Sequence, residues 1–168
     1  MNDNIVILKR QIRFLLAFFI GGLIISGATA IPVYDELKII MSLLPPGNII
    51  SGWFQRIHTA LAAVQTNYPF LLYGYDWLAF GHFAIAVAFI GPVKDPVKNI
   101  WVVEFGMIAC ALIIPYAFAC SVFRGIPLGW TLIDCSFGVI GIIPLLICRK
   151  KIMQLEKLEQ QDKLNLIF

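Results

Sequence analysis

The sequence predicts an all-α integral membrane protein: four transmembrane helices in a bundle, with one amphipathic interfacial helix between the first and second. Composition is the first reason. Of the 168 residues, 60% are hydrophobic and 14% are charged, whereas soluble domains are about 45–50% apolar and about 25% charged. The second reason is that several windows of about 20 residues carry almost no charge, which is the length that crosses ~30 Å of hydrocarbon. The third is a segment whose apolar residues recur with the period of a helix but which is too polar to cross a membrane.

The first span is predicted over residues 14–31 and follows a short basic start. This start is similar to a secretory signal peptide, because a basic region precedes an apolar run and an Ala-Thr-Ala sequence. The apolar run continues close to spanning length, so we expect a retained helix. Three small residues recur at every fourth position, Gly22, Ser26 and Ala30, with Gly21 and Gly27 beside them. Such a stripe lets another helix approach closely, which predicts a packing role for it.

An amphipathic helix is predicted over residues 48–66. Its apolar stripe contains Ile50, Trp53, Ile57, Leu61 and Val64, and its polar stripe contains Ser51, Gln55, His58 and Gln65. This pattern suits a helix that lies on the membrane surface. Because His58 belongs to the polar stripe, we expect it to be exposed to solvent. The alternative is that His58 faces the mouth of a polar interior.

The other three spans are predicted over residues 74–92, 97–121 and 128–148. Between the second and third, Asp95 followed by Pro96 is typical of an N-cap and first helical position. The carboxylate accepts a backbone N–H there, and proline has none to lose. Residues 1–151 therefore form one four-helix transmembrane domain. Residues 152–168 form a polar cytoplasmic tail that continues as a helix into water.

Basic residues flank the predicted spans mainly on one side: Lys9, Arg10, Arg13, Lys94, Lys98, Arg149, Lys150 and Lys151. The other side has fewer: Lys38, Arg56 and Arg124. The positive-inside rule therefore places both termini in the cytoplasm. The predicted location is a bacterial inner membrane or a plasma membrane.

Four ionisable residues are predicted to line an outward-facing polar pocket: Asp76, His82, Arg124 and Asp134. Ionisable groups at membrane depth are costly, which makes them functional candidates. His82 and Asp134 each lie about six residues, or ~9 Å, below the outer ends of their spans. We therefore expect these two side chains to meet. Asp134 shares a helix face with Gly138 and Gly141, and small-residue faces are typical of packing against protein.

Glu104 enters from the cytoplasmic end of the third span. Two roles fit this position. Glu104 is either the inner member of a proton or ion relay with His82 and Asp134, since titratable groups at graded depths can carry protons, or a local partner of Lys98 or of the residues around Trp101.

The metal candidates are His58, Asp76, His82 and Asp134, because histidine and carboxylate side chains suit zinc or iron. The chain has no H-x-x-x-H or E-x-x-H pair, the spacings that place two metal ligands on one helix face. Asp76 and His82 also project from different faces of one predicted helix. A bis-histidine haem would need His58 and His82, and His58 lies outside the predicted core. No pattern in the sequence identifies a cofactor.

The four cysteines are Cys110, Cys120, Cys135 and Cys148. All lie in apolar segments without a C-x-x-C pair, which predicts small packing residues. A bridge between Cys120 and Cys135 near the outer surface is the alternative.

Three functions fit these residues. The first is a pocket that binds a small ligand or ion. The second is a structural or accessory subunit of a larger membrane complex, and the third is a metal-dependent membrane enzyme, although no nucleotide-binding or hydrolase motif occurs. The expected partners are the lipid bilayer and either further copies of the chain or a membrane complex. Nucleic acid is excluded, because no basic patch is interleaved with aromatic residues.

Overall fold

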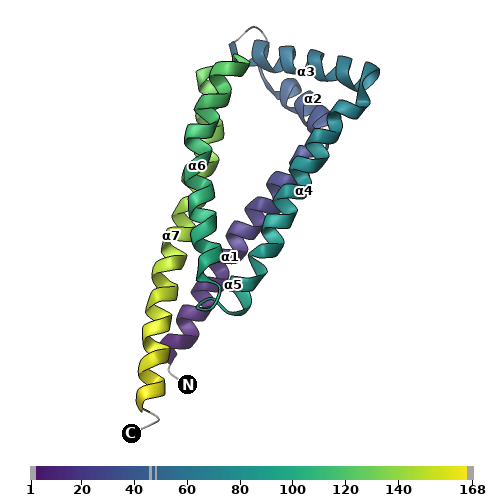
Figure 1. Cartoon of the computed structure of the whole chain (residues 1–168). Helices are drawn as coiled ribbons and strands as arrows, with labels where there is room; N and C mark the ends of the chain where they lie inside the picture. Colours follow the sequence, from purple (N-terminus) through teal and green to yellow (C-terminus); the bar gives the residue numbers. More distant parts are fainter. Residues whose placement is uncertain (1–2, 46, 48, 166–168) are drawn as a thin grey trace. The chain divides into compact units, whose positions relative to one another are not determined.

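The structure is a computed structural model that describes residues 3–45, 47 and 49–165. Every regular element in this part of the chain is a helix. The elements are α1 (Asp3–Ala30), α2 (Val33–Leu43), α3 (Ile49–Asn67), the 3-10 helix η1 (Pro69–Leu72), α4 (Tyr73–Ala88), α5 (Ile90–Lys94), α6 (Ile100–Arg124) and α7 (Leu128–Asn165) (Figure 1).

Four helical stretches of the described chain are long and apolar enough to cross a membrane: Asp3–Ala30, Pro69–Lys94, Ile100–Arg124 and Leu128–Asn165. The prediction of an all-helical protein with four such helices is therefore confirmed. The chain forms two compact units. Residues 1–21 and 87–168 form one, the α6–α7 unit, and residues 22–86 form the other, the α2–α3 unit.

Helices α6 and α7 form an antiparallel hairpin in the α6–α7 unit (Figure 1). Gly125 ends α6 in the left-handed conformation, with φ of 63°, which glycine adopts without a steric penalty. A Cβ atom placed on Gly138 of α7 would lie 2.5 Å from the backbone oxygen of Cys110 in α6. A Cβ atom placed on Gly141 would lie 3.0 Å from the Sγ atom of Cys110. The face predicted from Gly138 and Gly141 does pack against protein, and it brings the two backbones close together.

Phe89 packs against α1 and α6 in the core of the same unit. It lies in the turn between α4 and α5, and its side chain is fully buried. Its ring packs on the ring of Phe19 in α1, with 4.8 Å between the centroids. At Gly106 of α6, an added Cβ would lie 2.6 Å from Phe89 and 2.9 Å from Leu145 of α7. The missing side chain of Gly106 thus makes the space that the phenyl ring occupies.

The end of α7 packs against the start of α1. Four apolar side chains of these helices are fully buried: Ile12, Leu16, Ile152 and Leu155. An ion pair of 2.7 Å joins Lys9 to Glu159, and Lys151 donates a hydrogen bond of 2.8 Å to Gln11. The helical continuation of the predicted tail is confirmed to Asn165. Its packing on α1 was not predicted.

The prediction that Asp95 caps the third spanning helix is wrong. Helix α6 begins at Ile100, and its N-cap residue is Asn99. Residues 96–99 form a turn instead, in which the Asp95 carboxylate accepts the backbone N–H of Lys98 at 3.1 Å. The Asn99 side chain reinforces this turn by donating to the backbone oxygen of Asp95 at 2.9 Å.

The α2–α3 unit contains one predicted helix and one that was missed. Helix α3 (Ile49–Asn67) matches the helix predicted over residues 48–66, and its position on the membrane surface stays a prediction. Helix α2 packs on α3, and Leu37 of α2 and Leu61 of α3 are buried. Asp35 and Glu36 stand in the first turn of α2. Acidic residues there are a helix-start signal, which would have revealed α2 in the sequence.

Close approach between α1 and α4 in this unit occurs at Gly27. A Cβ on Gly27 would lie 2.8 Å from Phe83 and 3.0 Å from the backbone oxygen of Ala79. One on Gly22 would have no neighbour within 4 Å. The contact is therefore made at Gly27, which the prediction placed beside the small-residue stripe, and not at Gly22. One residue turns a helix by about 100°, so Gly27 presents a different face from Ser26.

The backbone contact at Gly138 gives a direct test of α6–α7 packing. We expect Gly138→Ala to lower stability by about 1–3 kcal/mol, because the new methyl group would collide with a carbonyl oxygen that cannot rotate away. Thermal unfolding in detergent measures the loss. Gly129→Ala on the same helix is the control, since its added Cβ would meet nothing within 4 Å. Equal melting temperatures for the two variants would contradict the packing described here.

Candidate functional site

A small polar pocket in the α2–α3 unit contains one predicted site residue, Asp76. The cavity measures about 100 Å³. Its polar lining consists of Tyr34, Asp35, Gln65, Tyr75 and Asp76. These residues come from the start of α2, the end of α3 and the start of α4, so the pocket forms where three elements meet.

Two carboxylates give this acidic pocket its charge. Asp35 stands in the first turn of α2 and Asp76 in the first turn of α4. Negative charge is stabilised at these positions by the positive end of the helix dipole. Both residues are exposed, and neither forms an ion pair within the described part of the chain. The arrangement therefore attracts positive charge.

The solvent exposure predicted for His58 is wrong. The imidazole ring stacks on the Tyr34 ring, with 4.7 Å between centroids and 19° between planes. Its Nε2 atom is buried without a hydrogen-bond partner among the described residues. The reason is α2, which covers this face of α3 and which the sequence analysis did not foresee. Because Tyr34 also lines the acidic pocket, it links His58 to that pocket.

His82 does not line the acidic pocket, although it shares α4 with Asp76. Six residues turn a helix to a different face, as the sequence analysis expected. The Nδ1 atom lies 2.8 Å from the backbone oxygen of Leu78. A carbonyl only accepts, so Nδ1 is the donor in this contact.

The other two predicted pocket residues belong to the α6–α7 unit. Arg124 is exposed in the last turn of α6, and Asp134 is half-buried on α7. Within the described residues they do not form an ion pair with each other. The contact between His82 and Asp134, and the pocket that would combine all four residues, stay predictions.

Glu104 is paired with Arg149, which was not among its predicted partners. Arg149 of α7 donates a hydrogen bond from Nε to the Glu104 carboxylate at 2.8 Å. The expectation of Lys98 as its local partner is wrong, because α7 brings Arg149 alongside. Glu104 and Arg149 lie nearly equal numbers of residues from the Gly125 turn, and this symmetry could have identified the pair. The relay role of Glu104 stays a prediction.

No three metal-binding side chains gather within the described residues of either unit. The four metal candidates, His58, Asp76, His82 and Asp134, thus do not form such a group there. The cysteines are free thiols, so the Cys120–Cys135 bridge is absent. Three of them are buried, Cys110, Cys135 and Cys148, which fits the predicted packing role.

A double-mutant cycle tests the Glu104–Arg149 pair. Both side chains are about 40% exposed, at 41% and 39%, so we expect a coupling energy of about 0.2–1 kcal/mol. Glu104→Gln, Arg149→Gln and the double variant are compared by thermal unfolding in detergent. The cycle of Glu104→Gln with Lys98→Gln is the control and should be additive. Coupling to Lys98 in place of Arg149 would contradict the observed pairing.

The chain matches no protein-family model, no curated protein and no solved structure.

Proposed function

We propose that the protein binds a small cationic ligand on the outer side of a membrane, in the acidic pocket between α2, α3 and α4. The observation that carries this proposal is the pair of carboxylates, Asp35 and Asp76, in one cavity of about 100 Å³. Neither has an ion-pair partner among the described residues. A cation that enters the cavity would interact with both.

The other polar groups favour a small organic cation or a monovalent ion. Tyr34 and Tyr75 provide aromatic surface, which attracts cations through the negative face of the ring. Gln65 adds an amide oxygen that can accept a hydrogen bond from an ammonium group. A tightly held transition metal fits less well, because the cavity lacks histidine, cysteine or a third carboxylate.

The outward orientation is supported by the basic residues near the span ends. Their distribution favours an orientation with both termini in the cytoplasm and the α2–α3 segment on the other side. We propose a bacterial inner membrane or a plasma membrane as the location. In this orientation α3 would lie along the outer membrane surface. Arg124, which ends α6, would also stand on the outer side.

A role as an accessory subunit of a larger membrane complex is the second candidate. Tyr116 favours it, because this phenol is 73% exposed within the apolar helix α6. A tyrosine hydroxyl in hydrocarbon needs a hydrogen-bond partner, and another chain would supply one. Lipid alone leaves the hydroxyl without a partner.

Competition between small and large cations tests the acidic pocket. We expect methylammonium or sodium chloride to raise the melting temperature more than N-methylglucamine chloride at equal ionic strength, because the larger cation does not fit. A ligand at a hundred times its Kd would stabilise the protein by about 2.7 kcal/mol. Asp35→Asn and Asp76→Asn should each abolish the difference in melting temperature between small and large cations.

The matched control is Glu36→Gln. It removes one negative charge from the same turn of α2, and Glu36 does not line the pocket. This variant should keep the cation effect. Equal effects of small and large cations on the unmodified protein would contradict the proposal. The same result in Glu36→Gln and Asp35→Asn would show that only the overall charge matters.

A further inference from the structure

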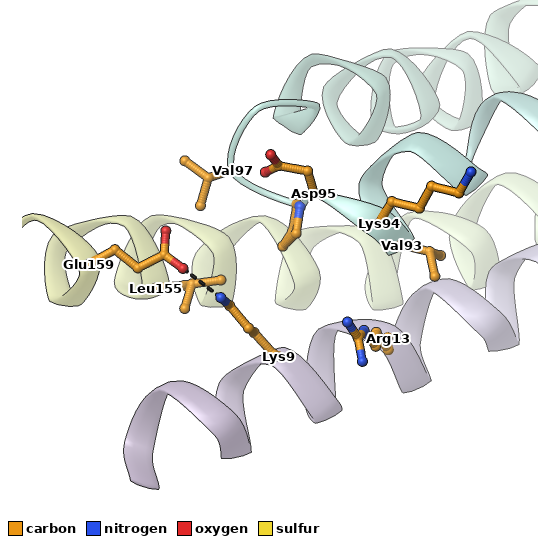
Figure 2. A pocket seen from close by; sticks show the side chains of 9 residues that line it. Lys9, Arg13, Val93, Lys94, Asp95, Val97, Leu155 and Glu159 are labelled. Carbon is orange, nitrogen blue, oxygen red and sulfur yellow. Dashed lines mark ion pairs between the residues drawn. The ribbon is translucent and has the colours of Figure 1, made fainter. Parts of the chain in front are cut away.

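A basic pocket lies in the α6–α7 unit, between the start of α1, the end of α5 and the last part of α7 (Figure 2). Its volume is about 220 Å³. Three cationic side chains line it: Lys9, Arg13 and Lys94. Two acidic side chains, Asp95 and Glu159, line it as well. The formal charge of this lining is therefore positive.

Both acidic groups already have partners. Glu159 pairs with Lys9 at 2.7 Å, and Figure 2 shows this contact across the pocket. The Asp95 carboxylate accepts the backbone N–H of Lys98 at 3.1 Å. Arg13 and Lys94 form no ion pair within the described part of the chain. Their donors are available to an anion.

These two cations stand at the ends of membrane-crossing segments. Arg13 directly precedes the apolar run that begins at Phe14, and Lys94 is the last residue of the candidate span Pro69–Lys94. Hydrocarbon ends at this level and the polar headgroup region begins. Phosphate groups are thus the anions present in greatest number beside Arg13 and Lys94.

The pocket has an apolar floor. Leu155 is fully buried beneath it, Pro96 is buried and Val93 is half-buried. Reduced access of water on this side strengthens the interaction between opposite charges. A guanidinium group matches two phosphate oxygens with its fork of N–H donors, and an ammonium group adds a point charge.

We infer that the basic pocket binds the phosphate group of a phospholipid headgroup. Arg13 and Lys94 hold the phosphate oxygens, while the Lys9–Glu159 pair closes one side of the pocket. The lipid is favoured over a free phosphate by the apolar run of α1 that begins directly after Arg13. On the face of α1 that carries Arg13, Ala17 lies one turn further along and is exposed, which gives the acyl chains an apolar surface. Basic pockets between membrane helices are a recurrent way of holding such headgroups.

Three probes separate the lipid from other sources of phosphate. The detergent-solubilised protein is titrated with short-chain phosphatidic acid, with a diacylglycerol that carries the same acyl chains, and with inorganic phosphate. Native mass spectrometry counts the bound molecules. We expect phosphatidic acid to bind at least about tenfold more tightly than the diacylglycerol, which corresponds to one strong charge-assisted contact. Inorganic phosphate at the same concentration should not displace it.

The variants compare residues on one helix. Arg13→Gln should weaken the binding of phosphatidic acid by at least about fivefold, since it removes the bidentate donor. Arg10→Gln is the matched control. It removes the same charge from α1, and Arg10 is exposed and does not line the basic pocket. Its affinity should stay within about twofold of that of the unmodified protein, because it loses only diffuse attraction.

Lys94→Gln tests the same pocket without a change in α1, because Lys94 lies on α5. If Arg13→Gln fails to fold, Lys94→Gln should still show the loss of affinity. Equal losses of affinity for phosphatidic acid in Arg10→Gln, Arg13→Gln and Lys94→Gln would overturn the site. Equal binding of phosphatidic acid and diacylglycerol would overturn the phosphate contact. Displacement by inorganic phosphate at the same concentration would overturn the lipid as the source.

Discussion

The packing of Phe89 against Gly106 is the contact on which the α6–α7 unit depends. Apolar side chains gain little from leaving lipid for protein, so membrane helices associate where their surfaces fit closely. Phe89 is buried between Phe19 of α1, Gly106 of α6 and Leu145 of α7. It lies directly before α5 (Ile90–Lys94), and Lys94 at the end of α5 lines the basic pocket together with Asp95.

The acidic pocket has a different origin. Its two carboxylates stand in the first turns of α2 and α4, where the helix dipole offsets part of the cost of an unpaired negative charge. The stacking of Tyr34 on His58 fixes α2 against α3 and places the Tyr34 ring in the pocket wall. Each pocket is thus built mainly from helix ends, where polar groups are tolerated, and not from the apolar middle of a span.

Apolar length and turn composition were enough to predict four spanning helices, because each depends only on its own residues. Helix α3 could also be predicted from its own residues, because its apolar side chains recur with the period of a helix. The errors concern contacts between elements. His58 was expected to be exposed because α2 was missed, and Glu104 was not assigned to Arg149 because that requires the α6–α7 register. Asp35 and Gln65 were missed as pocket residues, since nothing in their local sequence places them beside Asp76.

Labelling from each side of the membrane tests the proposed topology, in which the α2–α3 segment is outside and the turn that contains Lys98 is in the cytoplasm. The native cysteines are replaced by alanine, and a single cysteine is introduced at Gln55 of α3 or at Lys98 beside the basic pocket, both of which are exposed. An impermeant maleimide applied to right-side-out vesicles should label the cysteine at position 55 and leave the one at position 98 unmodified until the vesicles are opened. Labelling of both positions from the outside would contradict the four-span account.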